Sequence, residues 1–436
     1  MTEFRVHSAQ QPLHGTVRVP ADKSISHRAA ILGALSDSDV RIENFLPSET
    51  TQATVNCLRA LGASIDQVQP TTLIVHGGGL HSLREPDSVL FCAGSGTTMR
   101  LLAGLCAGQD FFSILDGTPA LKRRPMARVV EPLRSMGATI LGREGGRLPP
   151  LAFRGASPLR GIDYALPVAS AQAKSAILLA GLFADSPTTV REPGPSRDHT
   201  ERMLKASGVD LSLSPLVTCL RPPSALRLPG SISIPADLSS AAFFIVAALV
   251  VSKSEMCIPR VGVNATRTGL LDTLVRMGAR VQIENVGEES GEPVADIVLS
   301  AESKLRGTEV FGDEVPRMID EFPIFAVAAT QAQGETRVRD AQELRVKESD
   351  RIGTLAQELR KMGAQIEEQP DGFVVAGPTP LMGARVNAHH DHRLAMSLAV
   401  AGLVARGETI IDGWECVADS FPEFATTLQV ACEAAG

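Results

Sequence analysis

The sequence predicts an α/β fold made of six similar modules, and two alternating residue patterns support this prediction. In the first pattern, a polar or charged opening precedes a helix of small apolar residues whose apolar positions run almost all the way round. Such a distribution is typical of a helix that is buried on every side. The pattern occurs at 21–35, 95–106, 170–184, 237–250, 320–332 and 391–405.

The second pattern predicts the last turn of an outer helix, a glycine cap and then a strand, because glycine favours the left-handed conformation that commonly ends a helix. It occurs at Leu58 (LRALGASI), Leu133 (LRSMGATI), Leu204 (LKASGVDL), Leu274 (LVRMGARV) and Leu359 (LRKMGAQI). Together the patterns predict modules in which a strand, a buried helix, a strand, an outer helix and one or two strands follow one another. The later strands are expected at 72–76, 151–154, 297–299 and 372–375.

The expected domain boundaries follow from the chain length and from two similar prolyl passages. A chain of 436 residues is too long for one ordinary core and predicts two or three domains, so six modules divide evenly into two domains of three. The passages Val19-Pro20 and Ile234-Pro235 each precede a buried helix and are the expected crossings between domains. We therefore expect one domain at 22–235 and a discontinuous second domain at 1–21 with 236–436.

The charge pattern favours a small anionic ligand over a nucleic acid. The net charge is −7, yet several helix openings carry lysine or arginine, which indicates an acidic body with a basic binding site. We expect no secretion signal and no membrane span, since the longest apolar run is short. The seven cysteines form no CxxC pair and are expected to be reduced core residues of a cytoplasmic protein.

Three basic motifs are candidates for anion binding. Lys23 and Arg28 open the first buried helix in KSISHR, where two cations are costly unless they are paired or bind an anion. The small-residue loop of SGTTMR, with Gly96, lets a ligand approach backbone N–H groups, although a plain turn explains this motif equally well. The charge run KRRPM, with Arg124, is of a kind that is usually solvated, and only its place before an outer helix favours binding.

Proton-transfer chemistry is indicated by RVKESDR together with Asp320. Lys347 and Arg351 are four residues apart and are expected on one helical face, with Glu348 beside them. A salt-bridged helix face is the simplest explanation of this segment alone. Asp320 opens the fifth buried helix, however, so this module holds two carboxylates beside two cations, as proton transfer around an anion requires.

The run HHDHR at 389–393 has residue types that can bind a metal. We do not favour a metal site, because adjacent residues diverge in direction and no HxxxH or CxxC spacing supports one. His392 and Arg393 are expected to open the sixth buried helix toward the anion site.

The motifs DKSISHR, SGTTMR, KRRPM, SAQAKSA, SRDHTE, DEFP, RVKESDR, DHRLAM and SFPEF occur in this order along the chain. In their identity and order they resemble the family of 3-phosphoshikimate 1-carboxyvinyltransferases, also called 5-enolpyruvylshikimate-3-phosphate (EPSP) synthases, across nearly the whole length. The resemblance implies a two-domain inside-out α/β barrel-like fold, with three βαβαββ-type modules per domain and the active site in the interdomain cleft.

The implied function is that of a transferase of the shikimate pathway, which leads to chorismate and the aromatic amino acids. It moves the carboxyvinyl group of phosphoenolpyruvate to the 5-hydroxyl of shikimate 3-phosphate by addition and elimination, and releases phosphate. No metal and no organic cofactor is expected, and the partners are the two small anionic substrates, without nucleic acid or membrane. We expect a cytoplasmic monomer that glyphosate inhibits at the phosphoenolpyruvate site.

The site residues are carried over from the family motifs position by position. Shikimate 3-phosphate is expected to contact Lys23, Ser24, Arg28, Ser170, Gln172, Ser196, Arg197, Asp320 and Lys347. Phosphoenolpyruvate is expected to contact Lys23, Gly96, Arg124, Gln172, Arg351, His392 and Arg393. One departure is Asp419, which stands where many members carry a lysine that contacts phosphoenolpyruvate.

The reaction itself requires proton-transfer groups. Carbon 2 of an enol phosphate becomes electrophilic only when carbon 3 gains a proton, while the attacking hydroxyl loses one. We assign Asp320 to the hydroxyl proton, Glu348 to the methyl–methylene proton and Lys23 to the leaving phosphate. Two alternatives remain: a carboxyvinyltransferase acting on UDP-N-acetylglucosamine, which usually carries a cysteine near the position of Arg124, and a non-catalytic phosphate-ligand binding protein, which has no need of the two carboxylates.

Overall fold

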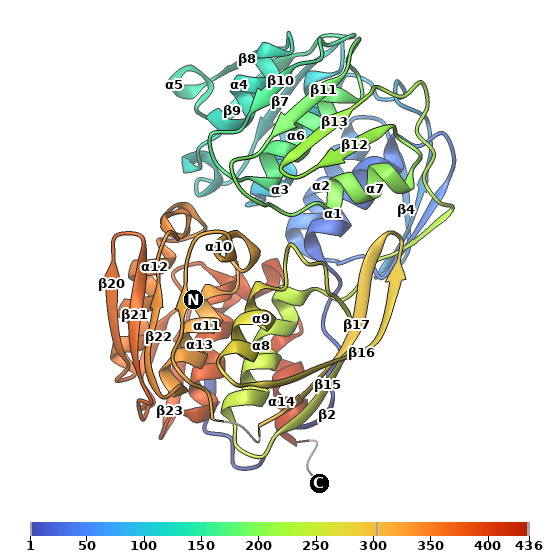
Figure 1. Cartoon of the computed structure of the whole chain (residues 1–436). Coiled ribbons are helices and arrows are strands. Elements are labelled where there is room, and N and C mark those ends of the chain that lie inside the picture. The colour runs from blue at the N-terminus through green and yellow to red at the C-terminus, as the bar shows by residue number, and fades with distance from the viewer. Residues whose placement is uncertain (1, 302–303, 434–436) are drawn as a thin grey trace. The chain divides into compact units, whose positions relative to one another are not determined.

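The computed structural model describes residues 2–301 and 304–433, and the chain forms two compact units (Figure 1). The N-terminal unit comprises Ala21–Ile234 with Glu288–Glu292. The C-terminal unit comprises Met1–Pro20, Pro235–Gly287 and Pro293–Gly436. Each unit is built around its own hydrophobic core.

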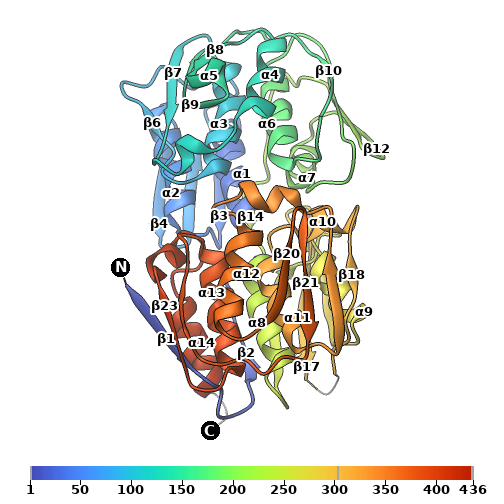
Figure 2. The same ribbon diagram turned by 90° about the vertical axis from the view of Figure 1, so that its left-hand side faces the viewer.

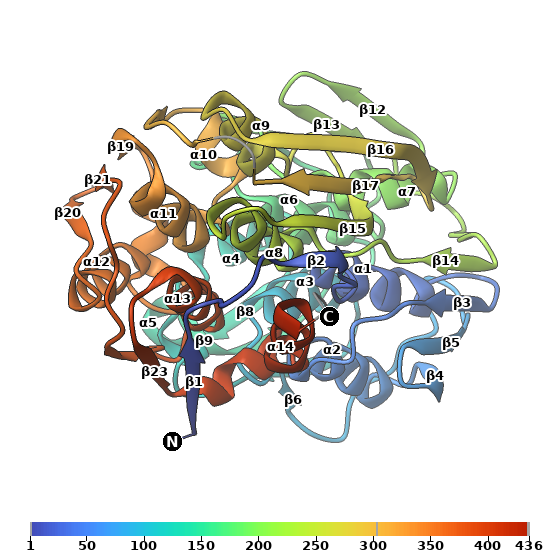
Figure 3. The same cartoon turned by 90° about the horizontal axis from the view of Figure 1, so that it is seen from below.

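The six helices predicted to be buried are confirmed. They are α1 (Lys23–Ala34), α3 (Gly96–Ala107), α6 (Ala171–Gly181), α8 (Leu238–Val250), α11 (Phe322–Gln331) and α13 (His392–Val404). Their small residues permit close packing: a Cβ atom at Gly104 of α3 would lie 2.2 Å from the Ala176 carbonyl oxygen of α6, and these helices lie side by side (Figure 2). In the C-terminal unit α8, α11 and α13 pack together, with the sheets of that unit around them (Figure 3).

The polar openings of α1, α3, α6, α8 and α13 act as N-caps, whereas α11 has no side-chain cap among the described residues. Side chains of Asp22, Ser95, Ser170, Asp237 and Asp391 each accept a hydrogen bond from a backbone N–H of the first turn, and so satisfy donors that a helix start leaves unpaired. The caps fix where each helix begins and therefore where the following polar side chains lie.

The outer helices and their glycine caps are also confirmed. The helices are α2 (Glu49–Ala60), α4 (Ala127–Ser135), α7 (His199–Ala206), α9 (Gly269–Arg276), α12 (Arg351–Lys361) and α14 (Phe424–Glu433). Positive φ angles occur after five of them, at Gly62, Gly137, Gly208, Gly278 and Gly363. Short helical turns complete the set at α5 (Arg143–Gly146), α10 (Glu314–Arg317), η1 (Leu121–Arg123), η2 (Gln342–Val346) and η3 (Trp414–Asp419).

The N-terminal unit has three sheets of one design. In each sheet two strands pair in parallel, and two further strands pair antiparallel beside them. In two of the sheets a buried helix, α3 or α6, connects the parallel strands. In the other sheet α1 precedes β3, and the parallel partner β14 comes from the end of the unit. The sheets are β14 (Ser231–Ser233), β3 (Val40–Glu43), β5 (Thr72–His76), β4 (Ser64–Gln69); β6 (Leu90–Phe91), β7 (Phe112–Asp116), β9 (Leu148–Arg154), β8 (Thr139–Gly142); and β10 (Asp163–Ala165), β11 (Thr188–Arg191), β13 (Val217–Leu220), β12 (Leu211–Ser214).

The C-terminal unit repeats this design with strands from both ends of the chain. Its sheets are β2 (His14–Thr16), β15 (Glu255–Gly262), β17 (Glu292–Ser300), β16 (Arg280–Glu289); β18 (Glu309–Val310), β19 (Gly334–Val338), β21 (Gly372–Gly377), β20 (Gln365–Gln369); and β22 (Arg385–Asn387), β23 (Glu408–Asp412), β1 (Glu3–His7). The last sheet has three strands, because β1 takes the place of the inner antiparallel strand and no described strand takes the place of the outer one. The predicted modular α/β fold is thus confirmed, with the sixth module incomplete.

One segment departs from the expected division at 22–235. The tip of the β16–β17 hairpin, Glu288–Glu292, packs with the N-terminal unit, although the sequence interpretation placed it in the other domain. Glu292 is buried there and its Oε1 lies 2.7 Å from Nδ1 of the buried His199, and Arg202 donates to the Gly291 carbonyl. These polar contacts join residues about ninety positions apart and leave no local sequence signal.

The cysteine prediction is correct only in part. Cys57, Cys92 and Cys106 are buried, whereas Cys219, Cys257, Cys416 and Cys432 are partly exposed, and all seven are free thiols. Cys219 and Cys257 lie on β13 and β15, where alternate residues can point outward from the sheet. Cys416 and Cys432 lie on the helical segments η3 and α14 near the end of the chain. Separately, no helix in the described part of the chain is long and apolar enough to cross a membrane.

Three buried threonines are expected to reduce stability. Thr188, Thr336 and Thr409 lie on β11, β19 and β23, and among the described residues their hydroxyls have no hydrogen-bond partner. Burying such a group costs about 1–3 kcal/mol, so each threonine-to-valine substitution should raise the free energy of unfolding by about 1 kcal/mol. Urea unfolding measures this. Thr330→Val is the control: its hydroxyl donates to the Val327 carbonyl at 2.7 Å, so this variant should lose stability, and equal losses at all four positions would contradict the prediction.

Candidate active site

The N-terminal unit presents a cationic cluster at the start of α1. Lys23 and Ser24 are its first residues and are half-buried, while Arg28, one turn on, is buried. The guanidinium of Arg28 donates from Nε to Thr200 Oγ1 (2.7 Å), from Nη1 to the Ser24 carbonyl (2.9 Å) and from Nη2 to Ser175 Oγ (2.7 Å). Within the described residues this buried cation therefore contacts only neutral groups.

Burial without a contacting carboxylate destabilises the charged form of Arg28. Burial is the main cause of the lowering of its pKa to about 10, and the nearby charge of Arg197 adds to the effect, although Glu201 and Asp22 act in the opposite direction. A bound anion would supply the missing negative charge. The site is thus suited to a phosphate or a carboxylate.

A second cationic group surrounds the start of α3. A Cβ atom at Gly96 would lie 2.7 Å from Arg100 Nη1 and 2.9 Å from Arg124 Nη1, so the two guanidinium groups approach the glycine backbone directly. Arg100 Nη1 donates to Gln172 Oε1 (2.7 Å), and Gln172 Nε2 donates to Thr97 Oγ1 (2.8 Å). Gly96, Arg124 and Gln172 are therefore brought together as the sequence predicted, and Arg100 joins them.

A buried charge cluster supports Ser196. Ser196 donates its hydroxyl to Glu192, whose other oxygen lies 2.6 Å from Lys174 Nζ. Lys174 also lies 2.6 Å from Glu201 Oε1. Burial opposes the charge of Lys174, but Glu201 and Glu192 outweigh burial and raise its pKa. Ser170 lies at the N-cap of α6 and is half-buried, as is Arg197 beside Ser196.

The C-terminal unit holds the second part of the predicted site, which is organised around Arg351. This arginine is almost completely buried, and its guanidinium lies 2.8 Å from Asp391 Oδ2, 3.2 Å from Asp320 Oδ1 and 2.7 Å from Glu348 Oε2. Burial opposes its charge, but Asp391, Glu348 and Asp320 together outweigh burial and raise its pKa. The same arginine lowers the pKa of the fully buried Asp391 despite the opposing effect of burial.

Asp320 is the point where three cations converge. In addition to Arg351, Lys347 Nζ lies 3.6 Å from Oδ1 and Arg393 Nη2 lies 3.8 Å from Oδ2. Asp320 and Glu348 retain some solvent exposure, whereas the arginines behind them are buried. Two accessible carboxylates beside three cations are the composition that proton transfer to and from an anion requires.

The reason predicted for this convergence is wrong. Lys347 and Arg351 were expected one helical turn apart on one face, but α12 begins only at Arg351, and Lys347 follows the short helix η2. Asp350 caps α12 by accepting from the Gly353 N–H (3.1 Å), which places the preceding residues in a loop. Lys347 and Glu348 approach Arg351 because this loop folds back on the helix start.

A further layer of polar residues holds Arg393. This arginine and His392 are buried at the first turn of α13, and Arg393 Nη1 lies 3.9 Å from the buried Glu321. Glu321 also accepts a hydrogen bond from the Ser239 hydroxyl. The same hydroxyl accepts a hydrogen bond from Arg267 Nη2 at 2.7 Å.

His389 of the HHDHR run is directed to a carboxylate. Its Nε2 lies 2.8 Å from Glu358 Oε1. Burial alone would raise the pKa of Glu358, but hydrogen bonds from His389, Lys361 and the Asn387 amide outweigh burial and lower it. In the described ranges, no group of three or more His, Cys, Asp or Glu side chains could hold a metal ion.

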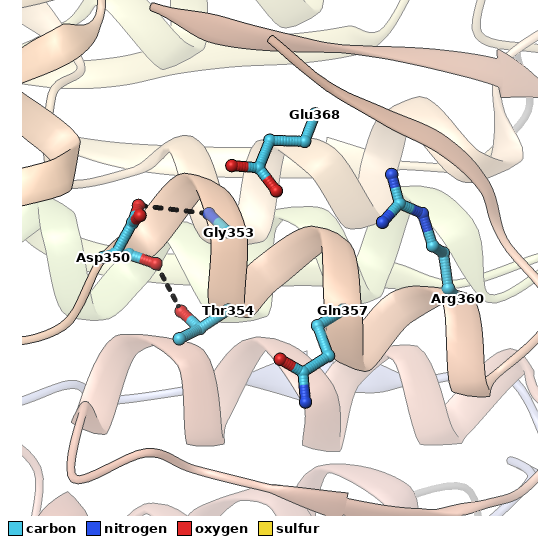
Figure 4. A pocket seen from close by; sticks show the side chains of 6 residues that line it. All are labelled: Asp350, Gly353, Thr354, Gln357, Arg360 and Glu368. Carbon is cyan, nitrogen blue, oxygen red and sulfur yellow. Dashed lines mark hydrogen bonds between the residues drawn. The ribbon is translucent and has the colours of Figure 1, made fainter. Parts of the chain in front are cut away.

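A shallow pocket lies on the outer face of α12, away from this cluster. It has a volume of about 520 Å³ and is lined by Asp350, Gly353, Thr354, Gln357, Arg360 and Glu368. Figure 4 shows Asp350 bonded to Gly353 and Thr354 at one end, with Arg360 at the other. None of these six residues belongs to the predicted site.

Sequence reasoning missed several members of the two clusters. Arg100 was visible as a basic residue in SGTTMR but had no assigned role. Ser175, Thr200 and Asp391 lie within recognised motifs, and only their contacts with Arg28 and Arg351 distinguish them from ordinary helix residues. No pattern in a single sequence carries that information.

Comparison with known proteins identifies the family of the chain. The model of the EPSP synthase (3-phosphoshikimate 1-carboxyvinyltransferase) family matches residues 7–428. The 3-phosphoshikimate 1-carboxyvinyltransferase of Desulforudis audaxviator (strain MP104C) is 52% identical over 416 residues, covering 95% of this chain and 96% of that protein. The protein of the same name from Geobacter sp. (strain M21) is 51% identical over 429 residues, covering 98% and 99%.

Among solved structures, EPSP synthase from Acinetobacter baumannii has a TM-score of 0.89 and 41% sequence identity, with 99% of this chain and 98% of that chain covered. A second structure of EPSP synthase from the same organism has a TM-score of 0.88 and 40% identity over the same shares. The similarity therefore extends over nearly the whole chain.

Proposed function

The chain belongs to the EPSP synthase (3-phosphoshikimate 1-carboxyvinyltransferase) family, and from this premise we propose how its own residues carry out the reaction. The protein is a transferase that moves the carboxyvinyl group of phosphoenolpyruvate to the 5-hydroxyl of shikimate 3-phosphate in the shikimate pathway. The observation that carries the mechanistic proposal is the contact of Asp320 with three cations, one of which also holds Glu348.

We assign the substrate contacts as follows. Arg28 and Ser196 bind shikimate 3-phosphate together with Lys23, Ser24, Ser170, Gln172, Arg197, Asp320 and Lys347. Arg124 and Arg351 bind phosphoenolpyruvate together with Lys23, Gly96, Gln172, His392 and Arg393. The buried Arg28, whose hydrogen-bond partners in the described chain are all neutral, supports the first set. The two guanidinium groups beside Gly96 support the second, because guanidinium donors match carboxylate and phosphate oxygens and stay charged.

In the addition step, Glu348 gives a proton to carbon 3 of phosphoenolpyruvate and Asp320 takes the proton of the attacking hydroxyl. The bond from the hydroxyl oxygen to carbon 2 forms as the double bond is protonated, which gives a tetrahedral adduct. Arg351 contacts both carboxylates, so it can keep each of them oriented while their charges change. General acid–base catalysis of this kind typically contributes 10²–10⁴-fold, as an order of magnitude.

In the elimination step Glu348 acts in reverse, and the proton that Asp320 took from the hydroxyl passes to the leaving phosphate. The carbon–oxygen bond to phosphate breaks, Glu348 takes a proton from the new methyl group, and the double bond forms again. Lys23 stabilises the charge that develops on the leaving phosphate. We propose domains at 22–235 and at 1–21 with 236–436, as the prolyl passages suggest. We also propose that the protein acts as a monomer in the cytoplasm.

A phosphate-release assay tests this function. The protein should release phosphate only when shikimate 3-phosphate and phosphoenolpyruvate are both present. UDP-N-acetylglucosamine in place of shikimate 3-phosphate should give no release, since it is the acceptor of the alternative carboxyvinyltransferase. Folded protein that releases no phosphate with either acceptor would leave only ligand binding and would contradict the assignment.

Glyphosate should inhibit competitively with phosphoenolpyruvate, and Gly96→Ala should weaken this inhibition. The added methyl would lie within 3 Å of both Arg100 and Arg124, so the guanidinium groups must shift, and such overpacking typically costs about 1–3 kcal/mol. We expect the inhibition constant to rise more than the KM for phosphoenolpyruvate. Gly94→Ala is the control, because its Cβ would meet only Thr118 Oγ1 at 3.9 Å. Insensitivity of the unmodified protein to millimolar glyphosate would refute control by Gly96 and make Asp419 the next residue to change.

A further inference from the structure

Two arginines with equal burial have opposite surroundings. Arg351 is held by three carboxylates, whereas Arg28 is held by two hydroxyls and a backbone carbonyl. A carboxylate beside Arg28 would cancel its charge and compete with an anionic ligand. Neutral acceptors can fix the direction of a guanidinium without cancelling its charge.

The two hydroxyls form one unit. Ser175 on α6 and Thr200 on α7 are each 1% exposed, and their oxygens are 2.7 Å apart. Ser175 accepts from Nη2 of Arg28, and Thr200 accepts from Nε. With the Ser24 carbonyl of α1, three helices each supply one hydrogen-bond acceptor to the guanidinium. Three acceptors together fix the plane of the guanidinium, which a single acceptor could not do.

The carboxylate next to Thr200 in the sequence is paired with a different cation. Glu201 directly follows Thr200 in α7, and its Oε1 lies 2.6 Å from Lys174 Nζ. Lys174 binds Glu192 at the same distance, so one buried lysine pairs with both carboxylates.

We propose that Ser175 and Thr200 are positioning residues that orient Arg28 through neutral hydrogen bonds and keep its charge available for an anionic group of shikimate 3-phosphate. This inference rests on the proposed substrate contacts and adds two residues that do not themselves touch substrate. It predicts that each hydroxyl matters for binding of shikimate 3-phosphate and not for the chemistry that follows.

The test compares threonine variants of nearly equal size. Thr200→Val removes the hydroxyl and keeps the shape, whereas Thr200→Ser keeps the hydroxyl. Thr188→Val is the matched control in the same unit, since Thr188 is buried and its hydroxyl has no partner in the described part of the chain. Ser175→Ala tests the second hydroxyl and decides the question if Thr200→Val does not fold.

Calorimetry measures the dissociation constant of shikimate 3-phosphate, and steady-state kinetics measures kcat and both KM values. Thr200→Val and Ser175→Ala should raise the dissociation constant and the KM for shikimate 3-phosphate about tenfold or more, the scale of a lost hydrogen bond to a charged group. The KM for phosphoenolpyruvate and kcat at saturation should change less than about threefold. Thr200→Ser should bind like the unmodified protein, as should Thr188→Val.

Two results would overturn the inference. Unchanged binding in folded Thr200→Val and Ser175→Ala would show that the hydroxyls do not position Arg28, and a fall in kcat with unchanged binding would place their effect elsewhere. Failure of the unmodified protein to bind shikimate 3-phosphate is a different result, because it would refute the proposed function and the inference with it.

Discussion

Asp320→Ala and Glu348→Gln are each expected to lower kcat by about a hundredfold or more, the scale of a general acid or base. Asp320 contacts Lys347, Arg351 and Arg393, and these contacts fix the position of the carboxylate that accepts the hydroxyl proton. Glu348 can exchange a proton with carbon 3, and glutamine in its place keeps the shape but cannot do so. Single-turnover rates measured with both substrates bound report this step directly.

The Asp320→Asn variant separates the proton transfer and charge of Asp320 from its shape, because asparagine keeps the size and a hydrogen-bond acceptor beside the three cations. It should lose activity nearly as fully as Asp320→Ala. Glu367→Gln provides the control: this glutamate is exposed on β20, accepts a hydrogen bond from Gln369 and belongs to neither charge cluster, so the turnover of this variant should be unchanged. Turnover close to normal in both Asp320→Asn and Glu348→Gln would contradict the assigned roles.

Arg351→Met is expected to lower the free energy of unfolding by about 3–5 kcal/mol at pH 7 and to abolish turnover. The substitution removes the partner of three carboxylates, of which Asp391 is fully buried, and breaking a buried pair leaves an uncompensated charge. Urea unfolding measures the loss. The free energy of unfolding of Arg351→Lys should lie between those of the unmodified protein and Arg351→Met. A lysine keeps the charge but cannot form the same fork of hydrogen bonds.

The stability loss in Arg351→Met should depend on pH. In the unmodified protein Arg351 lowers the pKa of Asp391 from its usual 3.8, so this carboxylate contributes stability above pH 3.8 and the contribution is lost as pH falls through its folded pKa. Without Arg351, burial should instead raise the pKa of Asp391, so the variant is stabilised by protonation as pH falls. The difference between the two proteins should therefore shrink from pH 7 to pH 5. An equal difference at both values, or no difference at pH 7, would contradict this account.

Periodic and local features of the fold could be predicted from the sequence. The buried helices repeat a run of small apolar residues, and Gly62 and its four counterparts end the outer helices with positive φ angles, because both features depend on residues that are neighbours in the chain. The loop before α12 could not be predicted: the four-residue spacing of Lys347 and Arg351 is equally compatible with a helix, and the cap at Asp350 decides against it.

Contacts between modules explain why the other polar contacts of the structure could not be predicted from the sequence. Arg28 meets Ser175 and Thr200, which lie 147 and 172 positions away, and Glu292 meets His199 across 93 positions. Each of these residues has an ordinary local context, so no spacing rule indicates its partner. The motifs therefore predicted which residue types gather in the site, and only the tertiary structure shows which polar groups hold them.

The central claim is that carbon 3 of phosphoenolpyruvate gains and then loses a proton while its carboxyvinyl group moves to the 5-hydroxyl. Mass spectrometry of the product formed in D₂O tests this most directly. We expect 5-O-(1-carboxyvinyl)-3-phosphoshikimate with deuterium in the vinyl group and one phosphate released per product, because a methyl group forms transiently and exchanges one of its hydrogens with solvent-derived deuterium. Pyruvate and phosphate without a shikimate adduct, or a carboxyvinyl product with no deuterium, would contradict the mechanism.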